Sequence, residues 1–153
     1  MYREFVDTPI GLLMIEAEER GIYAISPIFE KRFRENPSSS TALCKKQLSE
    51  YFCGKRSSFA LPLRQVGTEF QQRVWQELSR VGFGQTRSYG EIAMAIGHPM
   101  AHRAVGSANK KNRLPIVVPC HRIVGKDNSL IGYALGLDCK SWLLKHEEKF
   151  KPL

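Results

Sequence analysis

The segment Asn112-Arg-Leu-Pro-Ile-Val-Val-Pro-Cys-His-Arg-Ile-Val124 places an apolar run directly before a cysteine, a histidine and an arginine. We expect Ile116–Val118 to be buried and extended, with Pro119 fixing the backbone just before the cysteine. An isolated cysteine in an apolar run is usually a small buried hydrophobic residue. Here two basic side chains follow it, and nearby positive charge lowers the pKa of a thiol and favours the nucleophilic thiolate. Cys120 is therefore the candidate nucleophile.

A general base is expected beside this cysteine. Adjacent residues of an extended segment point to opposite faces, so His121 can reach the Cys120 sulfur only through a local turn or a bridging water. A third group should orient the imidazole. Glu147 is the best candidate, because it falls on the apolar stripe of a final helix predicted over 138–150 with its first residue as cap, and a buried carboxylate needs a partner. His146 lies near the same face and stays open as an alternative base.

Three helices are predicted upstream of the cysteine segment. Thr68 is expected to cap the first of them. Ser88-Tyr-Gly-Glu91 is a capping-box pattern that opens a second, short helix, with Gly97 as its stop. After a tight turn, a third helix is expected from Met100 to about Lys110. Two short helices joined by a turn that contains glycine, the second of them basic, predict a helix-turn-helix.

The third of these helices presents small side chains where a protein that reads the major groove carries long ones. Its sequence, Ala101-His-Arg-Ala-Val-Gly-Ser-Ala-Asn-Lys110, offers few side chains that could reach base edges. Small residues permit close approach of the backbone to a narrow surface such as a minor groove, and Arg103 is then one long cation on a smooth face. The alternative is that Gly106 and Ala108 pack tightly against another helix.

The charge is uneven along the chain. There are 23 Lys and Arg against 15 Asp and Glu, which gives a net charge of +8. Residues 1–66 carry 10 basic and 8 acidic residues, whereas residues 67–153 carry 13 basic and 7 acidic residues. Between Glu91 and Asp127 the sequence is basic without an acidic residue. A basic stripe confined to one half predicts a polyanionic partner, most simply nucleic acid; a solvated basic face is the alternative.

The first part of the chain predicts a small strand-rich domain over 1–66, followed by a second domain over 67–153. A helix is expected from Thr41 to a stop at Gly54, with Leu43, Leu48, Tyr51 and Phe52 near helical spacing. Residues 59–63 read as a last strand or a linker. Three short apolar runs separated by turn residues are typical of a strand meander: Tyr2–Val6, Leu12–Ala17 and Ile22–Ser26.

Length and composition predict an ordinary globular protein. The 153 residues are 42% hydrophobic and 25% charged, which is too apolar for a disordered chain. No apolar run reaches the roughly 20 residues that a membrane helix needs, and the first residues lack an apolar signal core, so we expect neither a membrane partner nor secretion. The four cysteines lie far apart without paired spacing, which indicates reduced thiols and a cytoplasmic or, in a eukaryote, nuclear protein, with the cytoplasm favoured.

Three motifs taken together resemble the signature of the O6-alkylguanine-DNA alkyltransferase family: Pro119-Cys-His-Arg122, the following Ile123-Val124 and the upstream Arg103-Ala-Val-Gly106. The similarity covers most of residues 67–150, and the first half resembles the family only in outline. The resemblance implies an α+β fold: a small N-terminal ribonuclease-H-like α/β domain, then a mostly helical winged-helix-like domain with the helix-turn-helix and the active-site cysteine.

The resemblance also implies DNA repair by direct alkyl transfer. A member of the family binds double-stranded DNA in the minor groove, rotates an alkylated guanine out of the stack and moves the alkyl group from O6 to its own cysteine. Each molecule acts once and needs no cofactor. Alkylated thymine, modified at O4, is a further candidate substrate. We expect this chain to act as a monomer.

By position, the resemblance assigns Cys120 as the alkyl acceptor and His121 as the water-linked base, with Glu147 as its orienter. Tyr89 would meet the base and protonate the leaving guanine, and Arg103 would fill the gap left in the base stack. The other expected DNA contacts are Ser88, Ala104, Gly106, Ser107, Lys110, Asn112 and Arg122. The expected substrate pocket is formed by Pro115, Ile123, Tyr133, Ala134 and Leu135, with the backbone carbonyls of Cys120 and Ile123 and the amide of Ala134 at the guanine edge.

The sequence departs from the family at two pocket positions. Ala134 stands where some members have a serine, so a hydroxyl contact is lost, and Leu135 replaces a small residue, which would restrict bulky alkyl groups such as benzyl. Some members carry zinc in the N-terminal domain. In this chain all four histidines lie in the second half, and Cys44 and Cys53 alone cannot complete a tetrahedral site, so we expect no structural zinc.

Three other functions compete with this one. An alkyltransferase-like lesion binder shares the fold but lacks the acceptor cysteine, and Cys120 argues against it. A cysteine hydrolase would need an oxyanion hole, which nothing in the sequence indicates, and would leave the basic helix unexplained. A transcription factor built on the helix-turn-helix would leave the nucleophile unexplained.

Overall fold

The computed structural model describes residues 1–126, 133 and 135–152. The chain forms two compact units, Met1–Gln65 and Val66–Leu153, and each is described by itself. The predicted fold class is confirmed: a small sheet with one helix is followed by a mostly helical unit. Among the described residues, no helix combines the length and apolar character needed to cross a bilayer.

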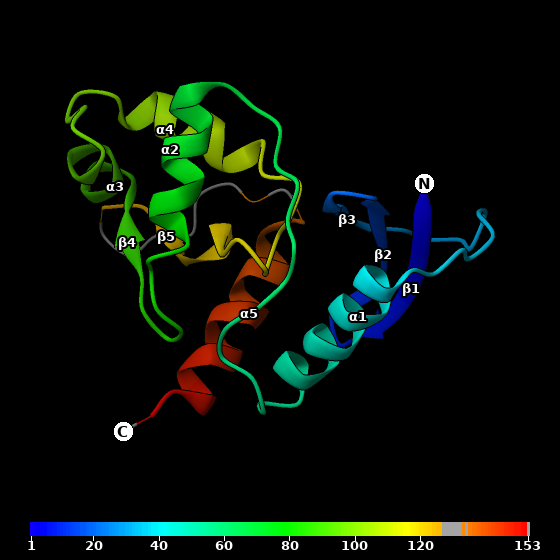
Figure 1. The fold of residues 1–153 in the computed structure, drawn as a ribbon. Coiled ribbons are helices and arrows are strands. Elements are labelled where there is room, and N and C mark those ends of the chain that lie inside the picture. The colour runs from blue at the N-terminus through cyan, green and yellow to red at the C-terminus, as the bar shows by residue number, and fades with distance from the viewer. Residues whose placement is uncertain (127–132, 134, 153) are drawn as a thin grey trace. The chain divides into compact units, whose positions relative to one another are not determined.

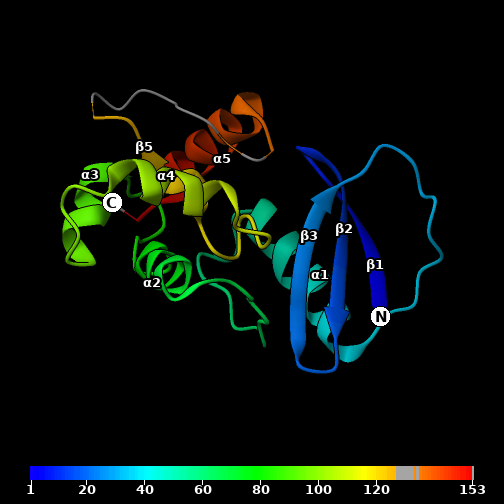
Figure 2. The same ribbon diagram turned by 90° about the horizontal axis from the view of Figure 1, so that it is seen from above.

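The first unit is a three-stranded antiparallel sheet with one helix packed on it (Figures 1 and 2). The strands are β1 (Tyr2–Thr8), β2 (Gly11–Glu18) and β3 (Gly21–Pro27), and they lie side by side in sequence order. The predicted meander is confirmed, and each strand extends one or two residues beyond the apolar run. The first hairpin pairs Thr8 with Gly11, and Gly11 adopts a φ of 113° in the left-handed region, which glycine tolerates without steric cost.

The helix of this unit, α1 (Ser39–Phe52), begins two residues before the predicted start. Ser38 is its cap: the Ser38 hydroxyl accepts a hydrogen bond from the Thr41 amide, and the Thr41 hydroxyl accepts one from the Ser38 amide. A threonine thus fills the position that glutamate or glutamine usually takes in a capping box. Of the apolar residues predicted at helical spacing, Leu48 and Tyr51 are fully buried, which confirms them, whereas Leu43 is exposed and lies off the buried stripe.

Residues 59–63 are a connection that touches the sheet at one point. Leu63 forms an isolated parallel bridge with Ile22. The Ile22 amide donates to the Pro62 carbonyl over 2.8 Å, and the Arg64 amide donates to the Ile22 carbonyl over 2.8 Å. The segment therefore belongs with the first unit without forming a strand of its own.

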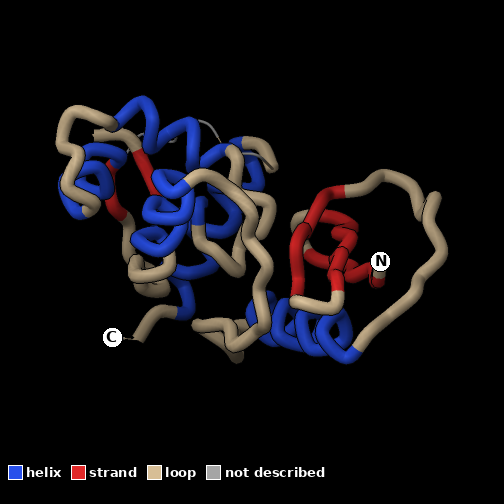
Figure 3. The backbone as a smooth tube through the Cα atoms, turned by 45° about the horizontal axis from the view of Figure 1, so that its top comes forward, coloured by secondary structure: helices blue, strands red, loops and turns tan. Residues whose placement is uncertain are grey.

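The second unit is mostly helical and contains two short strands (Figures 1 and 3). Its elements are α2 (Glu69–Leu78), β4 (Arg87–Ser88), α3 (Tyr89–Ala95), α4 (His102–Lys110), the one-turn 3₁₀ helix η1 (Cys120–Arg122), β5 (Ile123–Val124) and α5 (Leu137–Phe150). The predicted caps are confirmed, because the Thr68 and Ser88 side chains accept hydrogen bonds from the Gln71 and Glu91 amides. Helices α2, α3 and α4 pack on one another.

Two features bring distant parts of this unit together. Strands β4 and β5 pair in parallel, Arg87 with Ile123 and Ser88 with Val124, so the start of α3 lies beside the segment that follows Cys120. The Trp75 indole donates to the Ala108 carbonyl over 2.9 Å, which ties α2 to the end of α4. The last helix, α5, is preceded by Gly136 as its cap, with a φ of 92°. The predicted cap, Asp138, lies inside its first turn instead.

Candidate active site

The segment before Cys120 is buried but not extended, which corrects the prediction for Ile116–Val118. Ile116 has a φ of 76°, and the Val117 amide donates to the Pro115 carbonyl over 2.9 Å, which makes a tight three-residue turn. The Cys120 amide donates to the Val118 carbonyl over 2.7 Å and closes a second such turn around Pro119. Two successive turns thus replace the predicted extended segment and lead directly into η1.

Asn112 holds these turns together. Its amide nitrogen donates to the Val118 carbonyl over 2.9 Å, and its oxygen accepts from the Leu114 amide over 3.0 Å. The side chain is buried. Asn112 therefore ties the residues that follow α4 to the turns before Cys120, and this buried placement corrects its inclusion among the expected DNA contacts.

Cys120 lies at the start of η1 with 1% of its surface exposed. Burial raises the pKa of the Cys120 thiol above its ordinary value. Hydrogen bonds from Asn112 and Tyr133 and the positive charge of Lys140 act in the opposite direction but do not outweigh burial. The predicted lowering of the pKa by neighbouring positive charge is therefore present but is outweighed by burial, and the thiol needs a base.

His121 and Glu147 form a buried pair. The His121 Nε2 atom lies 2.6 Å from Glu147 Oε2, and both side chains are almost fully buried. Burial lowers the pKa of His121, although Glu147 acts to raise it, so the resting imidazole is neutral. A neutral imidazole beside an ionised carboxylate carries its proton on the nitrogen that faces the carboxylate. The lone pair is therefore on Nδ1.

The Nδ1 atom of His121 is buried and has no hydrogen-bond partner among the described residues. A buried polar atom without a protein partner is commonly satisfied by an ordered water. The arrangement supplies what a water-linked base requires: a neutral ring, a fixed tautomer and an available lone pair one residue from the thiol. The local turn of η1 keeps the histidine and the cysteine in the same helical turn.

Glu147 receives hydrogen bonds from more than His121. Arg122 donates from Nε to Oε1 over 2.8 Å and from a terminal nitrogen to Oε2 over 3.0 Å, and the Gly84 amide donates to Oε1 over 3.2 Å. Burial alone would raise the pKa of Glu147, but the hydrogen bonds and charges of His121 and Arg122 outweigh it and hold the pKa well below its ordinary range. The carboxylate stays ionised at neutral pH.

Arg122 does not belong to a DNA-binding surface, which corrects that prediction. Only 5% of it is exposed. Besides its two bonds to Glu147, it donates to the Val81 carbonyl over 2.7 Å. A two-bond arginine–carboxylate contact is strong and directional, and this one turns the guanidinium into the domain and away from solvent.

The sequence left both His121 and His146 as candidates for the general base, and their contacts in the structure distinguish them. His121 contacts Glu147. The His146 ring stacks on Trp142 at a centroid distance of 4.9 Å and lies 5.0 Å from the Phe150 ring. His146 is thus part of an aromatic cluster along α5.

Helix α4 has one exposed and one buried face. Val105, Ala108 and Asn109 are buried. The exposed face has short side chains beside two long cations and consists of His102, Arg103, Ala104, Ser107 and Lys110. Gly106 lies against the Tyr89 ring: a Cβ atom there would stand 3.7 Å from the ring edge. Both alternatives for the small residues of α4 thus apply in part. Ala104 and Ser107 form an exposed surface, whereas Gly106 packs against Tyr89.

Tyr89 begins α3, next to Ser88 as cap. Burial, and then the negative charge of a Cys120 thiolate, raise the pKa of the Tyr89 phenol, which keeps it protonated as a proton donor should be. The Ser88 hydroxyl is engaged with the Glu91 amide. Its first role is therefore to cap α3.

The expected pocket residues are only partly described. The Tyr133 ring lies 6.4 Å from the His121 ring, roughly edge to face, and Tyr133 acts to lower the pKa of the Cys120 thiol. Ile123 and Pro115 are buried and Leu135 is half-buried. Ala134 lies outside the described residues.

The sequence interpretation gave no role to two residues that contact the site. Asn109 donates to the Cys120 carbonyl over 3.3 Å, and Lys140, fully buried, donates to the Ile123 carbonyl over 2.5 Å. Helical spacing could have found both. Asn109 follows Val105 by four residues on the buried face of α4, and Lys140 precedes Glu147 by two turns of α5.

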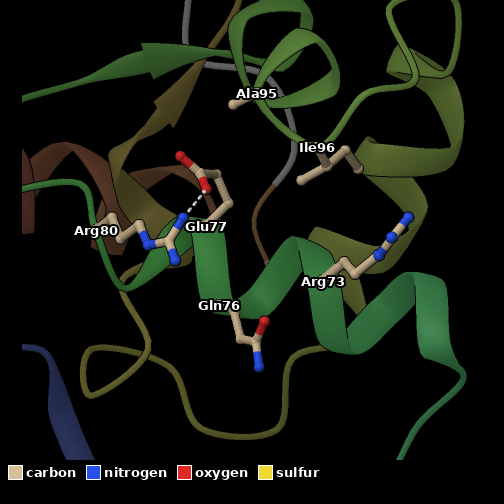
Figure 4. A pocket seen from close by; sticks show the side chains of 6 residues that line it. All are labelled: Arg73, Gln76, Glu77, Arg80, Ala95 and Ile96. Carbon is tan, nitrogen blue, oxygen red and sulfur yellow. Dashed lines mark hydrogen bonds and ion pairs between the residues drawn. The ribbon is translucent and has the colours of Figure 1, made fainter.

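Two other features of the described residues carry no chemistry for this site. A pocket between α2 and the end of α3 is lined by Arg73, Gln76, Glu77, Arg80, Ala95 and Ile96 (Figure 4). Its Glu77 carboxylate is paired with Arg80 over 3.0 Å. His, Cys, Asp and Glu side chains form no group of three or more that could hold a metal ion within the described ranges.

Comparisons with known proteins agree with these features. Residues 69–149 match the family model of the 6-O-methylguanine DNA methyltransferase DNA binding domain, and residues 1–65 match the ribonuclease-like domain of the same family. A methylated-DNA–protein-cysteine methyltransferase of Methanosarcina barkeri is 43% identical, and the match covers 97% of this chain and 98% of the relative. The constitutive methylated-DNA–protein-cysteine methyltransferase of Bacillus subtilis is 45% identical, and the match covers 95% of this chain and 94% of the relative.

Solved structures are similar over nearly the whole chain. The O6-methylguanine methyltransferase of Mycobacterium tuberculosis has a TM-score of 0.87 and 38% identity, covering 99% of this chain and 94% of that one. A structure of the Mycobacterium tuberculosis protein in complex with DNA has a TM-score of 0.90 and 37% identity, covering 99% and 96%.

Proposed function

Since the chain belongs to the 6-O-methylguanine DNA methyltransferase family, we propose that Cys120 is the alkyl acceptor and that it takes the methyl group of O6-methylguanine from a base rotated out of duplex DNA. The observation that carries the proposal is the buried row of Cys120, His121 and Glu147. In it a protonated thiol is followed by a neutral imidazole, whose far nitrogen contacts an ionised carboxylate.

The chemistry balances within these groups. His121 Nδ1 accepts the thiol proton through one water, and Glu147 stabilises the imidazolium that forms. The sulfur attacks the methyl carbon, a carbon–sulfur bond forms, and the bond between that carbon and O6 breaks. The Tyr89 phenol gives a proton to the leaving guanine and regains one from the imidazolium through solvent. The thioether product does not hydrolyse readily, so each molecule transfers once.

The exposed face of α4 is proposed as the DNA-binding surface. Family membership makes DNA the partner, and this face combines short side chains with Arg103 and Lys110. Short side chains permit close approach to a minor groove, and an inserted side chain can replace a displaced base in the stack. We assign that place to Arg103. Whether O4-methylthymine is also a substrate is decided by the same assay with a different duplex.

The test is intact-protein mass spectrometry after mixing the protein with excess duplex that carries one O6-methylguanine, followed by peptide mapping. A gain of one methylene unit on the peptide that contains Cys120, without further turnover, is the expected result. Tight binding without a mass gain would place the chain with the alkyltransferase-like lesion binders. A gain on another peptide would show that a different residue is the acceptor.

Arg103→Ala is expected to slow transfer from duplex DNA by about tenfold or more, because unstacking a base costs a few kcal/mol and the inserted side chain offsets part of that cost. Transfer from free O6-methylguanine base, which needs no rotation out of a stack, should change little. Single-turnover rates on both substrates measure the difference. Arg73→Ala, at an exposed arginine of α2, is the comparison variant for charge removal. Equal slowing on both substrates would exclude a role in base rotation.

A further inference from the structure

One buried polar atom at the active site is left over by the mechanism above. The Asn109 side chain is 2% exposed, and its oxygen Oδ1 has no hydrogen-bond partner within the described part of the chain. Leaving a buried acceptor unsatisfied costs about 1–3 kcal/mol. Such an atom in a site that must bind a ligand indicates that a donor arrives with the ligand.

The position of this amide is fixed by its other end. Asn109 Nδ2 donates to the Cys120 carbonyl over 3.3 Å. A carbonyl oxygen can only accept, so the nitrogen of the amide must face it and the oxygen must face elsewhere. The unpartnered oxygen is therefore on the side of the amide that faces away from the Cys120 carbonyl. The same helix carries Arg103 on its exposed face.

The Cys120 carbonyl already accepts hydrogen bonds from within the protein. A carbonyl oxygen has two lone pairs, and this one accepts both from Asn109 and from the Ile123 amide. The Ile123 carbonyl accepts from Lys140. The two carbonyls expected at the guanine edge thus already accept hydrogen bonds within the protein, whereas the exocyclic amine of guanine brings two hydrogens that need acceptors.

We propose that Asn109 is a specificity-determining residue, whose Oδ1 accepts one hydrogen of the exocyclic amine of the alkylated guanine. The proposal rests on the proposed function and deepens it. The amide relays the contact: it donates to the Cys120 carbonyl and accepts from the base. O4-alkylthymine has no such amine, so this bond favours purine substrates that carry one.

The experiment compares two duplexes that differ only in that amine. One carries O6-methylguanine and the other O6-methylhypoxanthine, in which a hydrogen replaces the amine, and single-turnover transfer rates are measured for both. We expect the wild-type protein to prefer O6-methylguanine, and Asn109→Leu to reduce that preference about fivefold to tenfold, the value of one neutral hydrogen bond. Gln76→Leu, an amide-to-leucine change at an exposed position of α2, should leave both rates unchanged.

Several outcomes would overturn the assignment. An equal rate loss on both duplexes in Asn109→Leu would mean that the amide only holds the Cys120 carbonyl, and no wild-type preference would mean that the amine is not recognised. If Asn109→Leu does not fold, Asn109→Asp decides: it keeps an acceptor oxygen and should retain the preference at a lower rate. Failure of the wild-type protein to accept a methyl group from either duplex would refute the proposed function instead.

Discussion

Cys120→Ala is expected to abolish methyl transfer completely while duplex DNA carrying O6-methylguanine is still bound with about the wild-type affinity. The alanine removes the sulfur that forms the new bond and leaves the exposed face of α4 untouched. Because the side chain is buried, the loss of one small group costs about 1 kcal/mol of stability, which a folded domain tolerates. Mass spectrometry measures transfer, and fluorescence anisotropy with labelled duplex measures binding.

The matched control is Cys53→Ala, which removes an exposed cysteine of the first unit and should transfer at the wild-type rate. Residual methylation of the Cys120→Ala protein would show that another nucleophile operates. Loss of DNA binding together with transfer would mean that Cys120 is needed for the structure of the site, and its assignment as acceptor would then lack support.

Glu147→Gln is expected to lower both the transfer rate and the stability. The amide cannot stabilise an imidazolium and does not impose the same tautomer on His121, and general-base catalysis is typically worth 10²- to 10⁴-fold, so we expect a rate loss on the order of 10²-fold or more. Removing one partner of a buried ion pair typically costs about 3–5 kcal/mol, because Arg122 stays buried without a counter-charge. Urea unfolding and single-turnover rates measure the two effects.

A second substitution separates catalysis from stability. Arg122→Met in the Glu147→Gln background removes the unpaired charge, so stability should partly recover while the transfer rate stays low. Glu148→Gln, at the neighbouring exposed residue of α5 that pairs with Lys151, is the control and should change neither. If the double variant regained the rate together with the stability, Glu147 would have only a structural role.

The pH dependence of stability follows from the low pKa of Glu147. A carboxyl whose pKa is lower in the folded state contributes stability that is present above its unfolded pKa, about 4.3, and is lost as the pH falls toward its folded value. The stability gap between wild type and Glu147→Gln should therefore be full at neutral pH and should shrink below about pH 4. A gap that stays constant down to pH 3 would contradict the low pKa.

Local signals in the sequence predicted most of the elements. The cap at Thr68, the capping box at Ser88 and the apolar strand runs depend on residues close in sequence, and they were confirmed. The start of α1 was missed because Thr41 takes the reciprocal position in its capping box. The start of α5 was misplaced because Gly136 has no side chain that could signal a cap.

The site was harder to predict where buried polar residues are involved. Arg122 looked like a surface cation, and only the distant Glu147 and Val81 explain its burial. Asn109 and Lys140 donate to the backbone carbonyls of Cys120 and Ile123. Every residue has a backbone carbonyl, so the sequence does not indicate which carbonyl accepts from a distant side chain. The burial of the Cys120 thiol likewise depends on the packing of several elements, so the direction of its pKa could not be read from neighbouring charges.

The strained turn at Ile116 limits which substitutions this segment can accept. A left-handed φ in a branched residue costs about 1–3 kcal/mol, and glycine would relieve it. Yet the side chain is only 1% exposed, and truncating a buried isoleucine costs about 2–5 kcal/mol, with a further 0.5–1 kcal/mol or so for the freedom of glycine in the unfolded chain. The backbone strain that glycine would relieve is thus smaller than the packing energy that would be lost with the isoleucine side chain. In a mutational scan the position should reject both glycine and polar residues. The burial of the isoleucine side chain therefore maintains a backbone conformation that is unfavourable for a branched residue.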